Sequence, residues 1–480
     1  MSARSLSPIL WLDIADERVD NPKSEFHPLT FAYYIFVFFA AMLAYSDFRR
    51  GIYLAIILDL LRDLVRKADP SQSVLITLAG AAVWGAVFLG ASRAYPGLIR
   101  RAYASHPLLH KSVSTFLVGL IPAAGLSTIL YSGGYKMAII GGVSFVAPLF
   151  GIAIGYALPR TAKDVYAMMA FYIIANGIFL VGVPLEHLGY DSPVLGGMKG
   201  MEWIRYRQGY IVDLIAGFYR SPDIMGLHAA SVVMFCFCNN LRPDTKSKPI
   251  WLAIASWAFF CLMLAGRRKM IGMPFVFLAS WFLLGKATKL VPLNRFFGFL
   301  AVCAIPLGVG LMILGGSDGN DEYSDYASTL LTESVHRTNE LVTGSIVTTI
   351  RQTGIFGAGL GSATQGRYHI GSGGPRAWQE DGVSRIFMEL GVFGVLCVLI
   401  AGKHFYNAVR RALQNPYGTY EARLLQLSLI SIVIAYAASF TVSHQQFSGD
   451  PGSGVIAMIF LGALFGLYAL PQHHVARDSM

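Results

Sequence analysis

Residues 137–158 read MAIIGGVSFVAPLFGIAIGYAL, an apolar run that follows Lys136 and ends before Pro159. The run holds no charged side chain and is long enough to cross a bilayer as a helix, which takes about 20 residues. Similar runs recur along the whole chain, each bounded by Arg, Lys, Pro or Gly, as expected of a helical bundle in lipid. The predicted spans are 29–46, 74–92, 114–131, 137–158, 164–183, 223–240, 249–266, 269–285, 294–315, 383–402, 425–442 and 453–470. We therefore predict an all-α polytopic membrane protein with about twelve transmembrane helices, folded as a single membrane domain over residues 1–480.

The composition supports the lipid bilayer as the main solvent. Hydrophobic residues make up 54% of the chain and charged residues 14%, well below the roughly one quarter that is usual in soluble domains. The net charge is +10, but Lys and Arg stand singly or in pairs at the ends of apolar runs, so we expect no nucleic-acid partner. The five cysteines fall in apolar segments, and we predict neither a disulfide framework nor a thiolate metal site. The N-terminal residues lack the pattern of a signal peptide, so no cleaved leader is predicted.

Two long connections, residues 184–222 and 316–382, are predicted to face the same side because an even number of spans separates them. The alternate connections 241–248, 286–293 and 403–424 are rich in Lys and Arg. The positive-inside rule places such basic connections in the cytoplasm. Both long loops are then extracytoplasmic, in the periplasm of a Gram-negative cell.

Residues 51–68 form an apolar segment that also carries charges at helical spacing. These charges are Asp59, Arg62, Asp63, Arg66 and Lys67. The pattern predicts an amphipathic helix that lies in the membrane interface rather than a span. With this assignment the basic connection 47–73 is external, against the positive-inside rule, and a crossing by this segment would change the count of spans.

The stretch AGFYRSPDIMGLHAAS (216–231) places charges where the first long loop enters the next span. Arg220, Asp223 and His228 fall at this junction, and charges at membrane depth suggest a functional site. Asp223 is expected near the start of the helix, where the helix dipole favours a carboxylate. The alternative is an interfacial Arg that snorkels to water.

A second group of cations occupies the short turn LAGRRKMIG (264–272), which the count of spans places outside. Arg267, Arg268 and Lys269 then lie on the side where basic residues are unexpected. An anionic ligand would account for them, because Arg binds phosphate oxygens in a bidentate manner. The alternative is an ordinary cytoplasmic turn.

The span after the second long loop begins with WQEDGVSRIFMELGVFG (378–394). Asp381, Arg385 and Glu389 recur every four residues and predict a polar stripe on one helix face. If Asp381 and Glu389 both pair with Arg385, Glu380 is left unpaired at the interface and is the most plausible base on physical grounds. The alternative is an ion-pair ladder that only fixes packing.

The Gly-rich run GIFGAGLGSATQG (354–366) stands between Arg351 and the pair Arg367 and His369. Glycines allow backbone N–H groups to approach a phosphate, but no strand and no Gly-Lys-Ser/Thr follows, so nucleotide binding is not predicted. The acidic patch at 318–325 matches no calcium-loop spacing, and we predict no metal. His444, in an external turn, is a weak candidate.

Four features occur in one order over residues 205–402. They are Arg220 with Gly226, an Arg at the next external turn, the phrase GIFGAGLGSATQG, and ELGVFG at the end of the polar span. In this order and spacing the chain resembles the bacterial O-antigen polymerase and O-antigen ligase superfamily of integral-membrane glycosyltransferases.

The resemblance implies an undecaprenyl-pyrophosphate-linked oligosaccharide as donor, held at the periplasmic face of the bacterial inner membrane. Transfer to an acceptor hydroxyl inverts the anomeric carbon and needs no metal, cofactor or nucleotide sugar. Arg220 and Arg267 or Arg268 match the pyrophosphate-contacting arginines of the superfamily. Further expected partners are the growing polysaccharide, a chain-length regulator and other export proteins.

Ligases of the superfamily place a His-Asn pair where this chain has Glu380 and Asp381. A carboxylate also removes a hydroxyl proton, so we expect a polymerase of an O-antigen or exopolysaccharide, with a ligase or a lipid-linked sugar flippase as alternatives. The predicted catalytic residues are Glu380, Asp381 and Arg220, with the base left open among Glu380, Asp381 and His369. The predicted substrate-binding residues are Arg267, Arg268, Arg351, Arg367, His369 and Arg385.

Overall fold

The computed structural model describes residues 28–198, 204–207, 210–242, 248–290, 344–364, 381–414, 419–448 and 451–478. Within these ranges the chain is almost entirely helical. Nine helices in the described part are long and apolar enough to cross a membrane. The chain is therefore a multi-pass all-helical membrane protein, and this part of the prediction is confirmed.

Most predicted spans coincide with helices. The nine that qualify by length and hydropathy are α1 (Pro28–Ser46), α3 (Ser73–Ala94), α5 (Pro107–Leu130), α6 (Gly134–Ala157), α7 (Ala162–Phe179, continued by α8, Gly182–His187), α9 (Pro222–Leu241), α11 (Arg268–Ala287), α16 (Gly382–Leu413) and α17 (Tyr420–Val442). Two more predicted spans, α10 (Lys248–Leu264) and α19 (Pro451–Asp478), carry shorter apolar stretches. The predicted span 294–315 lies outside the described residues, so the count of twelve is not confirmed.

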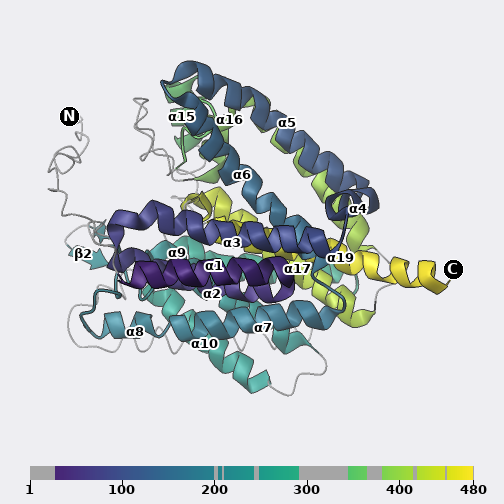
Figure 1. Cartoon of the computed structure of the whole chain (residues 1–480), viewed down its shortest axis with the longest axis horizontal. Helices are drawn as coiled ribbons and strands as arrows, with labels where there is room; N and C mark the ends of the chain where they lie inside the picture. The colour runs from purple at the N-terminus through teal and green to yellow at the C-terminus, as the bar shows by residue number, and fades with distance from the viewer. Residues whose placement is uncertain are drawn as a thin grey trace, which may run out of the picture.

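The helices form a main bundle and a lobe (Figure 1). In the main bundle α1, α2 and α3 lie side by side, and α9 occupies the interior, where every residue from 222 to 239 is buried. The lobe consists of α5, α6, α15 (Ser345–Thr353) and α16, with α16 packed along α5 and α6 packed along α19 of the bundle. Glycines allow this last pair to approach closely, because a Cβ on Gly155 would clash with the backbone of Ile459.

Helix α2 (Phe48–Ala68) overturns the prediction of an interfacial helix over residues 51–68. It turns back directly after α1 and packs against α1, α3 and α7 inside the main bundle. Asp59, Arg62, Asp63 and Lys67 are all buried. Their helical spacing places them on one polar stripe as expected, but protein covers the stripe, and Arg62 pairs with Asp59 at 2.9 Å. Spacing predicts which residues share a face and leaves open what covers that face.

The first long loop is partly ordered into small elements. After α8, strands β1 (Ile204–Arg207) and β2 (Tyr210–Asp213) form an antiparallel hairpin. The following segment 214–221 returns to the bundle, and Leu214, Ile215, Ala216 and Tyr219 are buried there. The second long loop is described only at 344–364 and from residue 381 onward. The remaining short helices are η1 (Pro70–Gln72), α4 (Leu98–Ser105) and α18 (Gln445–Ser448).

Candidate functional site

The start of α9 positions the first group of predicted charges. Ser221 caps the helix, and its hydroxyl accepts a hydrogen bond from the Ile224 amide at 3.4 Å. Pro222 takes the first helical position, which suits its fixed backbone angle. Asp223 follows in the first turn, where the positive end of the helix dipole stabilises a carboxylate. Arg220 directly precedes the cap.

The second predicted group meets the first at the start of α11. Arg267 Nη2 lies 3.2 Å from one oxygen of Asp223, and Lys269 Nζ lies 2.9 Å from the other. Lys269 also donates to the Ser443 hydroxyl at 2.7 Å. The side chains of Asp223, Arg267 and Lys269 are only 5%, 19% and 11% exposed. Two cations thus share one carboxylate in a largely dehydrated setting.

Arg220 brings a third cation within three residues of Asp223 in the chain. Its backbone N–H donates to Asp63 of α2 at 3.2 Å. Its guanidinium makes no hydrogen bond or ion pair with any residue in the described ranges. Three peptide units separate it from Asp223, so the two Cα atoms lie within about 11 Å. We call Arg220, Asp223, Arg267 and Lys269 the cationic end.

The last turn of α17 connects the cationic end to the start of α16. Ser443, which accepts the bond from Lys269, caps α17. One turn earlier, the carbonyl of Phe440 packs so tightly against Gly382 that a Cβ on Gly382 would clash with it. One helical turn rises about 5 Å. The start of α16 therefore contacts α17 about one turn away from the place where Lys269 contacts it.

Asp381 has a different partner from the one predicted. Its carboxylate caps α16 by accepting from the Ser384 amide at 2.7 Å and from the hydroxyl of Ser345 in α15. It does not pair with Arg385 in the structure. An Asp at this position satisfies amides that have no acceptor within the helix. The predicted ladder is therefore wrong in its Asp381–Arg385 contact, although Arg385 and Glu389 do pair.

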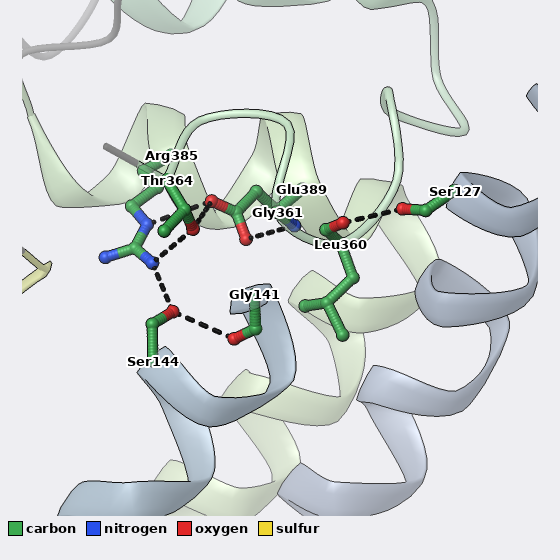
Figure 2. A network of polar contacts seen from close by, with 8 residues as sticks. All are labelled: Ser127, Gly141, Ser144, Leu360, Gly361, Thr364, Arg385 and Glu389. Carbon is green, nitrogen blue, oxygen red and sulfur yellow. Dashed lines mark hydrogen bonds and ion pairs between the residues drawn. The ribbon is translucent and has the colours of Figure 1, made fainter. Parts of the chain in front are cut away.

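Figure 2 shows the network around Arg385 and Glu389. Arg385 Nε lies 3.1 Å from Glu389, and Nη2 donates to Ser144 at 2.8 Å and to Thr364 at 3.1 Å. The second oxygen of Glu389 accepts the Gly361 amide at 3.0 Å. The side chains of Arg385 and Glu389 are 2% and 0% exposed. This buried pair of one cation and one carboxylate fixes the Gly-rich run onto α16. That agrees with the alternative interpretation of the polar stripe, in which the ion pair only fixes packing.

The Gly-rich run packs on the helix that follows it. The amides of Ala358, Leu360 and Gly361 donate to Met388, Ala123 and Glu389. These amides are thus bonded within the protein, rather than left to cradle a phosphate. The chain of α16 bends at Gly391, whose φ of 63° favours glycine, and a Cβ there would clash with Phe356. The two phrases GIFGAGLGSATQG and ELGVFG therefore form one packing unit.

The other predicted site residues are separate from this geometry. Glu380, Arg367 and His369 lie outside the described residues, as does the side chain of Arg268. Arg351 is exposed in the last turn of α15, in the lobe rather than at the cationic end. Among the described residues, no three His, Cys, Asp or Glu side chains gather as metal ligands would.

Sequence reasoning missed Asp63 and Lys67 of α2, which contact the segment that carries Arg220. The available signal was the stripe of charges in an apolar helix, which indicated a buried polar face as much as an interfacial one. His228 lies deeper on α9, where its Nδ1 is 2.6 Å from the Tyr172 hydroxyl. His444 is buried directly after Ser443.

No protein-family model matches the chain, and no curated protein matches it. The function is therefore inferred from the residues of the site.

Proposed function

We propose that the protein is an integral-membrane glycosyltransferase that polymerises a cell-surface polysaccharide, either an O-antigen or an exopolysaccharide. Its donor is an undecaprenyl-pyrophosphate-linked oligosaccharide, and its acceptor is a sugar hydroxyl of the growing glycan. The observation that carries the proposal is the cationic end, where Arg267 and Lys269 share the carboxylate of Asp223, three residues after Arg220 in the chain.

The charge at this end suits a pyrophosphate leaving group. Negative charge grows on the pyrophosphate as its bond to the sugar breaks, and cations fixed in a low-dielectric site stabilise that charge more than water does. The guanidinium of an Arg also matches a pair of phosphate oxygens in a bidentate contact. Asp223 holds Arg267 and Lys269 in place before the donor binds, so little reorganisation is needed.

The distribution of basic residues supports an extracytoplasmic position for the cationic end. Arg49 donates to the carbonyl oxygens of Ala157 and Leu158 at the end of α6. Asp63, which contacts Arg220, lies fourteen residues further along α2, or about 21 Å at 1.5 Å per residue. The turn at Arg49 is thus at the opposite end of the bundle.

If α2 crosses the membrane, the basic residues of that opposite end agree with the positive-inside rule. They include Arg49, Arg50, Arg160, Lys163, Arg242, Lys248, Lys286, Lys289, Arg410, Arg411 and Arg423. This assignment removes the conflict at residues 47–73. We place this end in the cytoplasm and the cationic end on the periplasmic side of a bacterial inner membrane.

The proposed step is a displacement at the anomeric carbon of the donor. The acceptor oxygen forms the new glycosidic bond, the bond from the anomeric carbon to the pyrophosphate oxygen breaks, and undecaprenyl pyrophosphate leaves with the electron pair. A base takes the hydroxyl proton. The carboxylate of Asp381 is already engaged by Ser384 and Ser345, which favours the adjacent Glu380, or His369, as the base.

The test uses purified full-length protein in liposomes with undecaprenyl-pyrophosphate-linked repeat units, without nucleotide or added metal. We expect a ladder of lengthening glycans on a gel. Arg220→Ala should reduce its formation by about 100-fold, in the range found for removal of one charge-stabilising group. The matched control is Arg410→Ala, which removes an exposed Arg in the last turn of α16 at the opposite end and should leave the ladder intact.

Other outcomes separate the alternatives. Product only with a lipid A core acceptor would indicate a ligase, which uses the same donor with another acceptor. Movement of the lipid-linked sugar across the bilayer without any new bond would indicate a flippase. Unchanged substrate with folded protein would overturn the polymerase proposal.

A further inference from the structure

Helix α2 carries a buried row of charges that the proposed reaction does not use directly. Asp59 and Asp63 both approach Arg62, at 2.9 Å and 3.6 Å, and Trp84 donates to Asp59 at 2.9 Å. Lys67 is 3% exposed at the end of the same helix. Charges this deep in a membrane protein require protein partners. The partners of Asp63 and Lys67 lie in the segment that leads to Arg220.

Two side chains of α2 hold the backbone of residues 214–222. Lys67 Nζ donates to the carbonyl oxygen of Gly217 at 2.8 Å and to that of Val194 at 3.1 Å. Asp63 accepts the backbone N–H of Arg220 at 3.2 Å. The two residues are four apart on α2 and therefore lie on the same helix face. They form hydrogen bonds with the segment at two residues, Gly217 and Arg220, that are three positions apart.

A third contact reaches the same segment from the other direction. Glu186 of α8 accepts the backbone N–H groups of Ala216 and Gly217. Gly217 has a φ of 61°, and a Cβ there would press on Val183, so the turn depends on glycine. Donors and acceptors of the backbone from 216 to 220 are thus fixed by side chains of α2 and α8, one turn before α9 begins.

We propose that Asp63 and Lys67 are positioning residues that set the place of Arg220 at the pyrophosphate subsite. The inference rests on the proposed function of the cationic end. Arg220 lacks an ion pair within the described ranges, so its guanidinium has no side-chain partner there to orient it. Its backbone, in contrast, is held by Asp63, and the preceding turn is held by Lys67. Displacing a group that contacts the reacting centre by about 1 Å can cost a reaction about 100-fold.

The test compares variants of these two residues with a neighbour on the same helix. Lys67→Met keeps the length of the side chain and removes the donor, and Asp63→Leu removes the acceptor. Asp59→Asn is the matched control, because it also removes a buried charge from α2 but contacts Arg62 and Trp84 rather than the segment. Lys67→Arg keeps a side-chain donor, so its effect on the segment should be smaller than that of Lys67→Met.

The first readout is backbone hydrogen exchange of the peptide that contains 214–222, measured without donor. We expect about tenfold faster exchange in Lys67→Met and Asp63→Leu and no change in Asp59→Asn, since local opening sets the exchange rate. The second readout is kcat/KM for the lipid-linked donor, which should fall about 10- to 100-fold in the first two variants only. Size-exclusion chromatography confirms folded protein, and Lys67→Gln, whose shorter amide reaches at most one carbonyl, replaces Lys67→Met if that variant fails to insert.

The outcomes separate this inference from the proposed function. Unchanged exchange in both variants would show that Asp63 and Lys67 do not fix residues 214–222, whether or not the protein forms glycan. Faster exchange with full turnover in an active protein would overturn the positioning role. A wild-type protein that forms no product would instead overturn the proposed function, and the positioning role with it.

Discussion

Arg385 and Arg267 are both predicted from the sequence to bind substrate, yet they lie in opposite electrostatic surroundings. Arg385 faces one carboxylate, Glu389, and both groups form further hydrogen bonds with the Gly-rich run, and Arg385 also with Ser144 of α6. Arg267 shares the carboxylate of Asp223 with Lys269. In one region a single cation pairs with a single carboxylate, and in the other two cations share one carboxylate.

The difference shows how to tell a structural buried charge from one that awaits a ligand. A buried ion pair is tolerated when each partner is fully hydrogen-bonded, and its replacement by apolar residues is often neutral. A group of cations around too few carboxylates stays unfavourable until an anion arrives. We therefore assign stability to the lobe network and donor binding to the cationic end.

The largest expected effect is on stability, in the lobe. Glu389→Leu leaves the guanidinium of Arg385 buried without a counter-charge and removes the acceptor of the Gly361 amide. We expect the free energy of unfolding to fall by about 3–5 kcal/mol, the usual cost of breaking one side of a buried pair. SDS-induced unfolding in mixed micelles measures this. A loss below about 1 kcal/mol would contradict a structural role for the pair.

The double variant Arg385→Met with Glu389→Leu is the control. Replacing both partners by apolar residues of similar volume should return the stability to within about 1–2 kcal/mol of the original protein. Glycan formation should return with it, because neither charge contacts the donor in our assignment. A stable double variant without activity would move Arg385 back to the substrate-binding set.

The sequence predicts the membrane helices well because bilayer thickness imposes a length that an apolar run must meet. The sequence does not predict the position of α2, because the five charges between residues 59 and 67 suit either a membrane interface or a protein interior. The choice depends on partners such as Trp84 of α3 and Gly217, which are 25 and more residues away in the chain. Local spacing carries no information about such partners.

The candidate site, too, could be predicted from the sequence only in part. The cations of residues 264–272 are recognisable because they break the positive-inside rule, a property of the chain itself. Their contact with Asp223 and the bridge through Ser443 depend on packing of three helices. Asp381 was assigned to Arg385 by helical periodicity, but the carboxylate at a helix start caps the helix amides instead. Periodicity applies within a helix and fails at its first residue.

The second expected effect is on turnover, at the cationic end. Arg267→Ala should lower kcat/KM by about 10²–10³-fold, because it removes a charge that stabilises the leaving pyrophosphate. The free energy of unfolding should fall clearly less than in Glu389→Leu, since Asp223 keeps the ammonium of Lys269 at 2.9 Å as a counter-charge. The same unfolding assay and donor titration give both numbers. A large loss of stability with normal turnover would reverse the roles of the two regions.

The smallest expected effect separates charge from geometry at Arg220. Arg220→Lys keeps the positive charge but loses the planar fork that contacts two phosphate oxygens at once. We expect kcat/KM to fall about tenfold, clearly less than in Arg220→Ala, because a point charge still attracts the pyrophosphate. A Lys variant as active as the original protein would mean that the excess of charge alone binds the donor. A Lys variant as poor as the Ala variant would mean that the bidentate contact is required, and it would make the backbone clamp by Asp63 and Lys67 the main determinant of where that contact forms.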